Sequence, residues 1–99
     1  MCKDKEIEEN RKKAINMFVD ELPSLRAKIS ISQDELADYV GISRQTLSSV
    51  ELKKREITWH VFLSLVLFFT LQKKTNAALK LIPGFTEALG KCLNYDGSL

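Results

Sequence analysis

Residues 31–51 read ISQDELADYVGISRQTLSSVE, and the pattern of this segment predicts two short helices joined by a turn. Ser32 is followed three residues later by Glu35, which is the pattern of a capping box at the start of a helix. Gly41 ends that helix, because glycine adopts the left-handed conformation beyond a helix at little cost. The first half of the stretch therefore predicts one short helix with a defined beginning and end.

The second half predicts another helix, over residues 44–52, capped by the hydroxyl of Ser43. Ala37 supplies a small side chain where the second helix must cross close to the first. The outward face of the second helix carries short or hydrogen-bonding side chains, and the major groove of B-DNA is wide enough to admit such a helix. Two capped helices joined by a sharp turn are typical of a helix-turn-helix.

Outside this stretch, the spacing of apolar residues also predicts helices, with hardly any strand signal. Pro23 is expected to break the first helix or to open the next one. The fold class is all-α: a compact five-helix core with an extra N-terminal helix and a short helical C-terminal extension. We divide the chain into 1–22, an amphipathic helix; 23–71, the helix-turn-helix core; and 72–99, an extension that could support dimerisation. The individual helices are expected over residues 4–22, 23–29, 58–71, 76–82 and 85–93.

Composition narrows the classes of function. The chain has 99 residues, a net charge of only +2, two cysteines and one histidine, so it lacks the ligands of a usual zinc site. No cofactor, no metal and no enzymatic activity are expected, because there is no nucleophile motif and no glycine-rich phosphate loop. The longest apolar run, residues 61–71, is shorter than the roughly 20 residues that span a bilayer. A cytoplasmic protein with no membrane partner is the expectation.

With its flanking helices, the stretch resembles the Cro/C1-type (Xre-like) helix-turn-helix family of phage repressors. The pattern SQ-x-E-L-A…GIS-x-x-T-L-x-x-x-E carries the resemblance, which covers residues 23–69. It implies a phage-repressor-like fold, double-stranded DNA as the partner, and transcription regulation, with repression as the expected mode. An antitoxin-like or other protein-interaction module, with a toxin as partner, is the alternative function.

The resemblance also implies roles for single residues. Gln33 would contact a phosphate, Thr46 the sugar-phosphate backbone, and the base edges would be met by Arg44, Gln45 and Ser49. Arginine can donate two hydrogen bonds to guanine and glutamine can pair with adenine, which suits this assignment. The implied DNA-binding set is Gln33, Ser43, Arg44, Gln45, Thr46, Ser49, Lys53, Lys54 and Arg55.

Two further residues, Arg26 and Glu51, match a pair that often forms a structural salt bridge in this family. The chain departs from the family just after Glu51, where Leu52 and Lys53 replace the usual asparagine followed by glycine or lysine. A reshaped loop is therefore expected at that point.

Apolar side chains are abundant over residues 62–69 and 79–89. A contiguous exposed apolar surface marks a partner site, so a homodimer through one or both regions is expected. The competing expectation is that the N-terminal helix folds back over the same surface within one chain.

Overall fold

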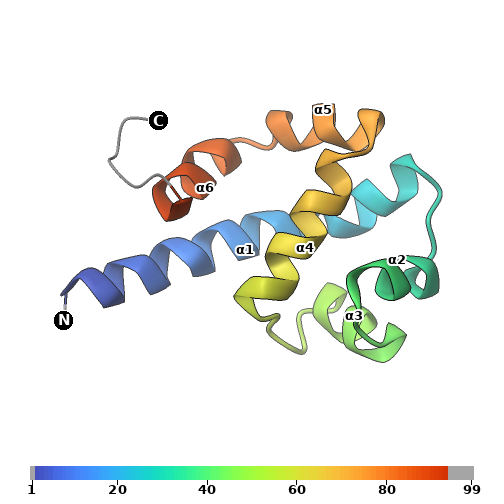
Figure 1. Cartoon of the computed structure of the whole chain (residues 1–99), viewed down its shortest axis with the longest axis horizontal. Coiled ribbons are helices and arrows are strands. Elements are labelled where there is room, and N and C mark those ends of the chain that lie inside the picture. The colour runs from blue at the N-terminus through green and yellow to red at the C-terminus, as the bar shows by residue number, and fades with distance from the viewer. Residues whose placement is uncertain (1, 94–99) are drawn as a thin grey trace.

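The computed structural model describes residues 2–93, and within them it contains helices and no strand. The all-α class is therefore confirmed. Figure 1 shows the long helix α1 along the length of the molecule, with α4 crossing it, α2 and α3 below its C-terminal end, and α5 and α6 above it. The helices are α1 (Cys2–Lys28), α2 (Gln33–Val40), α3 (Arg44–Glu51), α4 (Trp59–Thr70), α5 (Lys73–Leu81) and α6 (Phe85–Leu93).

The expected helix break at Pro23 is wrong, because α1 continues through this residue. A proline inside a helix removes one hydrogen bond and costs about 3 kcal/mol or more. Leu22 and Leu25 flank it and are buried in the same core, while Pro23 itself lies on the exposed face. Burial of the flanking leucines stabilises a continuous helix in spite of the proline, since tertiary packing supplies most helical stability in proteins. The boundary drawn between 22 and 23 thus falls inside one helix.

The remaining helices lie close to their predicted bounds, except that α5 begins three residues earlier than expected. Thr75 explains the difference. Its buried hydroxyl donates to the backbone carbonyl of Phe69 at 2.6 Å, which fixes the turn before α5. The backbone N–H of Asn76 then donates to the carbonyl of Gln72 at 2.8 Å and closes the first helical turn. The extension expected over 72–99 is described here only to residue 93, and residues 94–99 lie outside the described part.

Phe18 of α1 lies at the centre of the core and is fully buried. Its ring meets Phe62 edge-on at a centroid distance of 5.5 Å, and Phe69 at 6.2 Å. It stacks on Phe85 of α6 at 6.0 Å. The Phe18 side chain therefore joins α1 to both α4 and α6. The C-terminal helix α6 thus shares one hydrophobic core with α1 and α4.

The N-terminal helix α1 covers much of the apolar surface, in residues 62–69 and 79–89, that was expected to bind a second chain. Phe62, Phe69, Leu79 and Phe85 are all buried, and α1 packs against α4, α5 and α6. These four residues are therefore not available to a second chain, which corrects the broader expectation. None of the described helices combines the length and the apolarity that crossing a bilayer requires.

Candidate nucleic-acid interface

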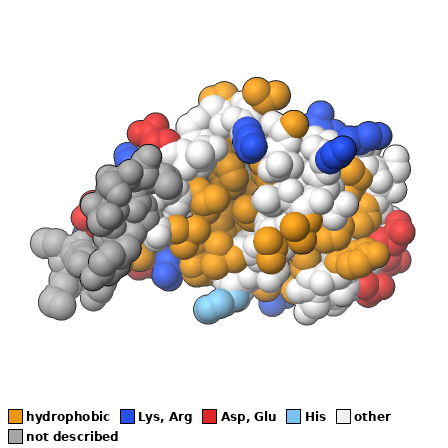
Figure 2. All heavy atoms as spheres, turned by 45° about the horizontal axis from the view of Figure 1, so that its top comes forward, with side chains coloured by type: hydrophobic (Ala, Val, Ile, Leu, Met, Phe, Trp, Pro, Cys, Tyr) orange, Lys and Arg blue, Asp and Glu red, His pale blue; other side chains and the backbone are white. Residues whose placement is uncertain are grey.

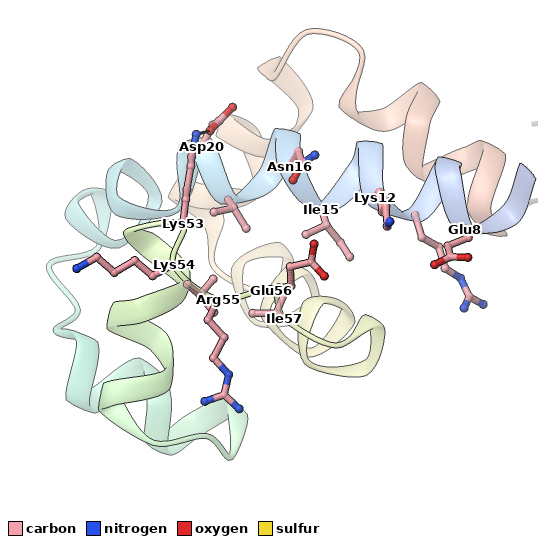
Figure 3. Close-up of a pocket in the computed structure, with 13 residues that line it drawn as sticks. Glu8, Lys12, Ile15, Asn16, Asp20, Lys53, Lys54, Arg55, Glu56 and Ile57 are labelled. Atoms are coloured by element: carbon pink, nitrogen blue, oxygen red, sulfur yellow. Dashed lines mark ion pairs between the residues drawn. The ribbon is translucent and has the colours of Figure 1, made fainter. Parts of the chain in front are cut away.

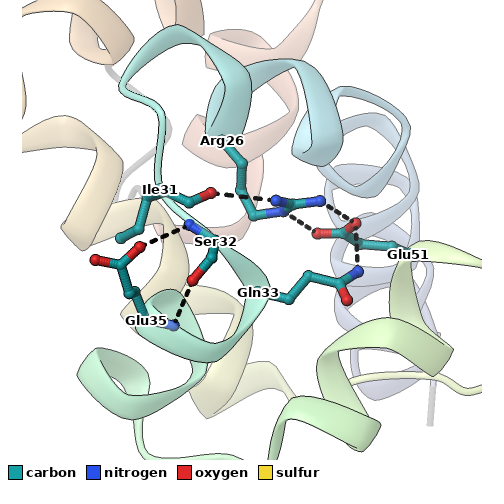
Figure 4. Close-up of polar contacts among 6 residues, drawn as sticks. All are labelled: Arg26, Ile31, Ser32, Gln33, Glu35 and Glu51. Carbon is teal, nitrogen blue, oxygen red and sulfur yellow. Dashed lines mark hydrogen bonds and ion pairs between the residues drawn. The ribbon is translucent and has the colours of Figure 1, made fainter.

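The first helix of the pair, α2, begins at the predicted capping box. The Ser32 hydroxyl accepts a hydrogen bond from the backbone N–H of Glu35 at 3.0 Å, and the Glu35 carboxylate accepts one from the N–H of Ser32 at 3.1 Å. Figure 4 shows this reciprocal pair. Both contacts satisfy N–H groups that a helix start otherwise leaves without a partner, so the start of α2 is fixed.

The turn between α2 and α3 depends on Gly41, whose φ of 79° is left-handed. The N–H groups of Gly41 and Ile42 both donate to the carbonyl of Ala37, at 2.9 and 3.0 Å. This closes α2 and directs the chain into α3. No atom lies within 4 Å of a Cβ built on Gly41, so the backbone conformation alone requires glycine there.

The start of α3 is held by two hydroxyl groups. The Ser43 hydroxyl accepts from the N–H of Thr46 at 3.0 Å and donates to the Thr46 hydroxyl at 2.8 Å. Arg55 donates to the same Thr46 hydroxyl at 3.4 Å. Ser43, Thr46 and Arg55 are therefore brought together at the N-terminal end of α3, where a helix attracts negative groups such as phosphates.

Arg44 and Gln45 are both exposed in the first turn of α3, and Ser49 is half-buried one turn further on. The Arg44 Nε lies 3.9 Å from the Asp34 Oδ1 on α2, and both side chains are largely exposed. An exposed pair of this kind contributes little and can exchange for another acceptor. The side chains of Arg44 and Gln45 are thus accessible to a ligand.

A polar cluster of Arg26, Gln33 and Glu51 ties three helices together. The Arg26 guanidinium donates to both carboxylate oxygens of Glu51, at 2.6 and 2.9 Å, and to the carbonyl of Ile31 at 3.2 Å. The Gln33 amide donates to Glu51 at 3.0 Å. Figure 4 shows Glu51 placed between the two donors. The end of α1, the start of α2 and the end of α3 are therefore fixed relative to one another.

The geometry of this cluster makes it strong. Only 7% of the Glu51 side chain and 20% of the Arg26 side chain are exposed, and the two-point contact is the charge-assisted kind. The hydrogen bond to Glu51 raises the pKa of Arg26, helped by the charge of the carboxylate and opposed by partial burial. The guanidinium thus stays charged at every pH at which the fold is expected to survive.

Gln33 keeps a donor for a ligand despite this contact. Its amide carries two N–H groups, and Glu51 accepts from one of them. The other remains for an acceptor such as a phosphate oxygen. The contact with Glu51 also restricts the rotation of the Gln33 side chain, which lowers the entropy lost on binding.

The loop after α3 is closed by Lys53 in a conformation that usually belongs to glycine. Its φ is 61°, and its N–H donates to the carbonyl of Val50 at 3.0 Å. The N–H of Lys54 reaches back to the carbonyl of Ser49 at 2.9 Å. These two bonds form the usual left-handed ending of a helix, here with lysine in the left-handed position.

Lys53, Lys54 and Arg55 form a basic run in this loop, and their side chains point in different directions. Lys53 forms an ion pair with Asp20 on α1, whereas Lys54 and Arg55 point away from α1 in Figure 3. Sequence reasoning missed Asp20, because nothing in the local pattern links it to a residue 33 positions later. Lys53 is therefore partly neutralised, and Lys54 and Arg55 are the freer cations of the run.

An open groove of about 680 Å³ separates α1 from this loop. Apolar side chains, including Ile15, Val19 and Ile57, form part of its lining, and charges of both signs complete it. Figure 3 shows Ile15 on α1 and Ile57 in the loop. Within residues 2–93 no three His, Cys, Asp or Glu side chains gather where they could hold a metal ion.

A comparison with protein-family models matches residues 24–67 to the family described as helix-turn-helix. Residues 24–67 are a helix-turn-helix domain of the Cro/C1 type. The match begins in the last turns of α1 and includes α2, α3 and most of α4. Comparisons with curated proteins and with solved structures gave no match.

The match supports a DNA-binding helix-turn-helix regulator as the general class. Every candidate DNA-binding residue lies inside the matched segment, as do Arg26 and Glu51. Asp20 and Phe18 lie outside it, on the part of α1 that precedes the match.

Proposed function

We propose that the protein is a sequence-specific transcription repressor that binds double-stranded DNA as a homodimer, with α3 in the major groove. The observation that carries this proposal is the exposed, polar first turn of α3, positioned by the cluster of Arg26, Gln33 and Glu51. A rigid polar helix end at a protein surface is what reading of base edges needs, because the donors must meet base atoms at set positions.

Base reading falls to Arg44, Gln45 and Ser49. The first two are exposed in the first turn of α3, where side chains of a recognition helix reach base edges. Ser49 follows on the next turn and is short enough to let the helix approach closely. These three residues carry the sequence preference in this proposal.

Phosphate contacts surround the base-reading residues. Gln33 offers its second amide N–H, and Ser43 and Thr46 offer hydroxyl groups at the start of α3. The loop after α3 adds the cations Lys53, Lys54 and Arg55. Contacts of this kind give affinity and orientation without sequence information. Repression then requires only occupancy, because a protein bound across a promoter blocks access to the same base pairs.

Selection of DNA duplexes from a randomised pool, repeated at two salt concentrations, tests the proposal. We expect enrichment of an inverted repeat whose half-sites lie about 34–36 Å apart, which is the spacing for two copies on one face of DNA. Salt-sensitive binding without any enriched sequence would remove the claim of sequence-specific regulation. Failure to bind at low salt would remove DNA as the partner and favour a protein-interaction module.

Two variants separate base reading from phosphate contact. Gln45→Ala should relax the preference at one base pair, by about 1–3 kcal/mol, with a smaller loss of general binding. Lys54→Ala should weaken binding to all sequences and reduce the salt slope by about one. Identical behaviour of the two variants would contradict the assignment of roles.

A further inference from the structure

The groove between α1 and the loop after α3 brings together cations from two distant parts of the sequence. Arg11 and Lys12 line it from α1, and Lys53, Lys54 and Arg55 line it from the loop. Figure 3 shows Lys12 on α1 and Lys54 and Arg55 on the loop. Because the family match begins at residue 24, the two cations of α1 lie outside the matched domain. The groove thus continues the basic run of the loop onto a part of the chain that the family does not assign.

Acidic side chains line the groove as well. Glu8 and Asp20 lie on α1, and Glu56 lies in the loop. Asp20 is paired with Lys53. Of the five cations and three carboxylates in the lining, four cations and two carboxylates remain when this pair is set aside. The groove therefore keeps an excess of positive charge.

Arg11 lies against an aromatic ring at the start of α4. Its Cζ is 4.8 Å from the centroid of the Trp59 ring, and Trp59 is the first residue of α4. Trp59 in turn stacks on the buried Phe62, with 5.1 Å between the ring centroids. An arginine can stack on an aromatic face and still donate through the N–H groups at its edge, in the fork that suits a phosphate. The ring therefore restricts the guanidinium and leaves its donors available.

Arg11 also lies within reach of a DNA strand that meets the loop. Arg55 donates to Thr46 at the start of α3 and is a candidate phosphate contact. Trp59 follows Arg55 by four residues, so their Cα atoms are at most about 14 Å apart. One strand of B-DNA carries a phosphate about every 3.4 Å along the helix axis. A strand that meets Arg55 therefore has further phosphates within the distance that separates it from Trp59.

We propose that Arg11 is a further contact to the DNA backbone, made from α1 to a phosphate that flanks the base pairs read by α3, and that Trp59 is its positioning residue. This rests on the proposed function in one respect, that α3 and the following loop bind double-stranded DNA. A contact of this kind adds affinity without sequence information.

The distribution of charge explains why a single cation matters here. The chain has a net charge of only +2. Figure 2 shows basic and acidic side chains in small separate groups, with apolar side chains between them. Charges more than about 10 Å away are largely screened at roughly 0.1 M salt. DNA is therefore attracted by the cations next to it and not by the protein as a whole.

Fluorescence anisotropy of the full chain with a randomised DNA duplex, over a range of salt concentrations, tests the proposal. Arg11→Gln should weaken binding and lower the salt slope by about 0.9, so that its deficit relative to the wild type grows about eightfold for each tenfold fall in salt. Lys13→Gln is the matched control, because Lys13 is an exposed cation of α1 outside the lining of the groove. Equal salt slopes for Arg11→Gln and the wild type, or equal losses in the two variants, would overturn the proposal.

Neutralisation of a carboxylate in the groove should have the opposite effect. Glu8 lines the groove about one turn from Arg11, so Glu8→Gln should strengthen binding to the same duplex by up to about fivefold, the range of an exposed ion pair. Glu9 is exposed on the next residue but lies outside the lining, so Glu9→Gln should change binding less. Weaker binding by Glu8→Gln would contradict a phosphate at this position.

A double-mutant cycle tests the role of Trp59. Trp59→Leu should weaken DNA binding in the wild-type chain and add little to the loss in Arg11→Gln, because the ring acts through the guanidinium. Circular dichroism shows that each variant is folded at the temperature of the binding experiment. Additive losses would overturn Trp59 as the positioning residue.

The wild-type chain separates this proposal from the proposed function. If it does not bind DNA at low salt, both are overturned. If it binds DNA and enriches a sequence while Arg11→Gln keeps the wild-type salt slope, only the contact from α1 is overturned.

Discussion

Replacement of Glu51 by glutamine tests whether the ion pair with Arg26 holds α3 in place. The substitution keeps the size of the side chain and removes its charge, so Arg26 loses the anionic partner and one of its two carboxylate acceptors, and Gln33 loses a strong acceptor. Hydrogen bonds to charged groups contribute about 1.5–3 kcal/mol each, and removal of one partner of a buried pair costs about 3–5 kcal/mol.

For Glu51→Gln the expected loss of unfolding free energy is smaller than the roughly 5 kcal/mol that removal of one partner of a fully buried pair can cost. Arg26 keeps 20% exposure and can recruit water, and the glutamine oxygen still accepts one hydrogen bond. We therefore expect a loss of about 2–3 kcal/mol. For a domain of this length, each kcal/mol lowers Tm by about 4–8 °C, which gives a fall of about 10–20 °C.

Thermal and urea unfolding followed by circular dichroism measure this loss. Glu56→Gln is the control, because Glu56 is an exposed carboxylate in the neighbouring loop. Similar unfolding of the two variants would refute the reasoning. A double variant, Arg26→Met with Glu51→Leu, should be less destabilised than Glu51→Gln, since it leaves no buried charge without a partner. A double variant that is less stable than Glu51→Gln would also count against the argument.

Three further perturbations follow from the structure. Asp20→Asn releases Lys53 and should strengthen binding to all DNA sequences by up to about fivefold, the range of an exposed ion pair, as measured by fluorescence anisotropy; the gain should vanish when Lys53→Ala is added. Gly41→Ala should lower the free energy of unfolding by about 1–2 kcal/mol through backbone strain alone, and a loss below about 0.5 kcal/mol would contradict this. Burial raises the pKa of the Cys92 thiol, so in a Cys2→Ser background its alkylation at pH 8 should be slower than that of free cysteine and should accelerate as pH rises; equal rates would contradict it.

The helix-turn-helix was predictable because its signals are local. Ser32, Glu35, Gly41 and Ser43 act within a few residues of their own positions, and the structure has helices that begin and end at them. The position of Arg44 and Gln45 on the first turn of α3 follows directly from the cap at Ser43. A pattern that depends on nearest neighbours can be recognised without knowing the rest of the fold.

The features that sequence reasoning missed depend on contacts between distant segments. Pro23 is tolerated because Leu22 and Leu25 are buried by other helices, which no local rule reveals. The ion pair of Lys53 with Asp20 and the place of Phe18 among three other rings have the same origin. The partners of Asp20 and Phe18 lie at least 33 positions away along the chain. The continuity of α1 through Pro23 depends on the packed core as a whole.

The continuity of α1 has a consequence for how the chain can be divided. The family match begins at residue 24, yet the helix that holds Arg26 begins more than twenty residues earlier and buries Phe18 against α4 and α6. A fragment trimmed to the matched segment would expose the faces of Phe62 and Phe69 that Phe18 now covers. The segment that the family model matches is thus shorter than the segment that shares one packed core, and Arg26 joins the end of α1 to Glu51 at the end of α3 and to Ile31 just before α2.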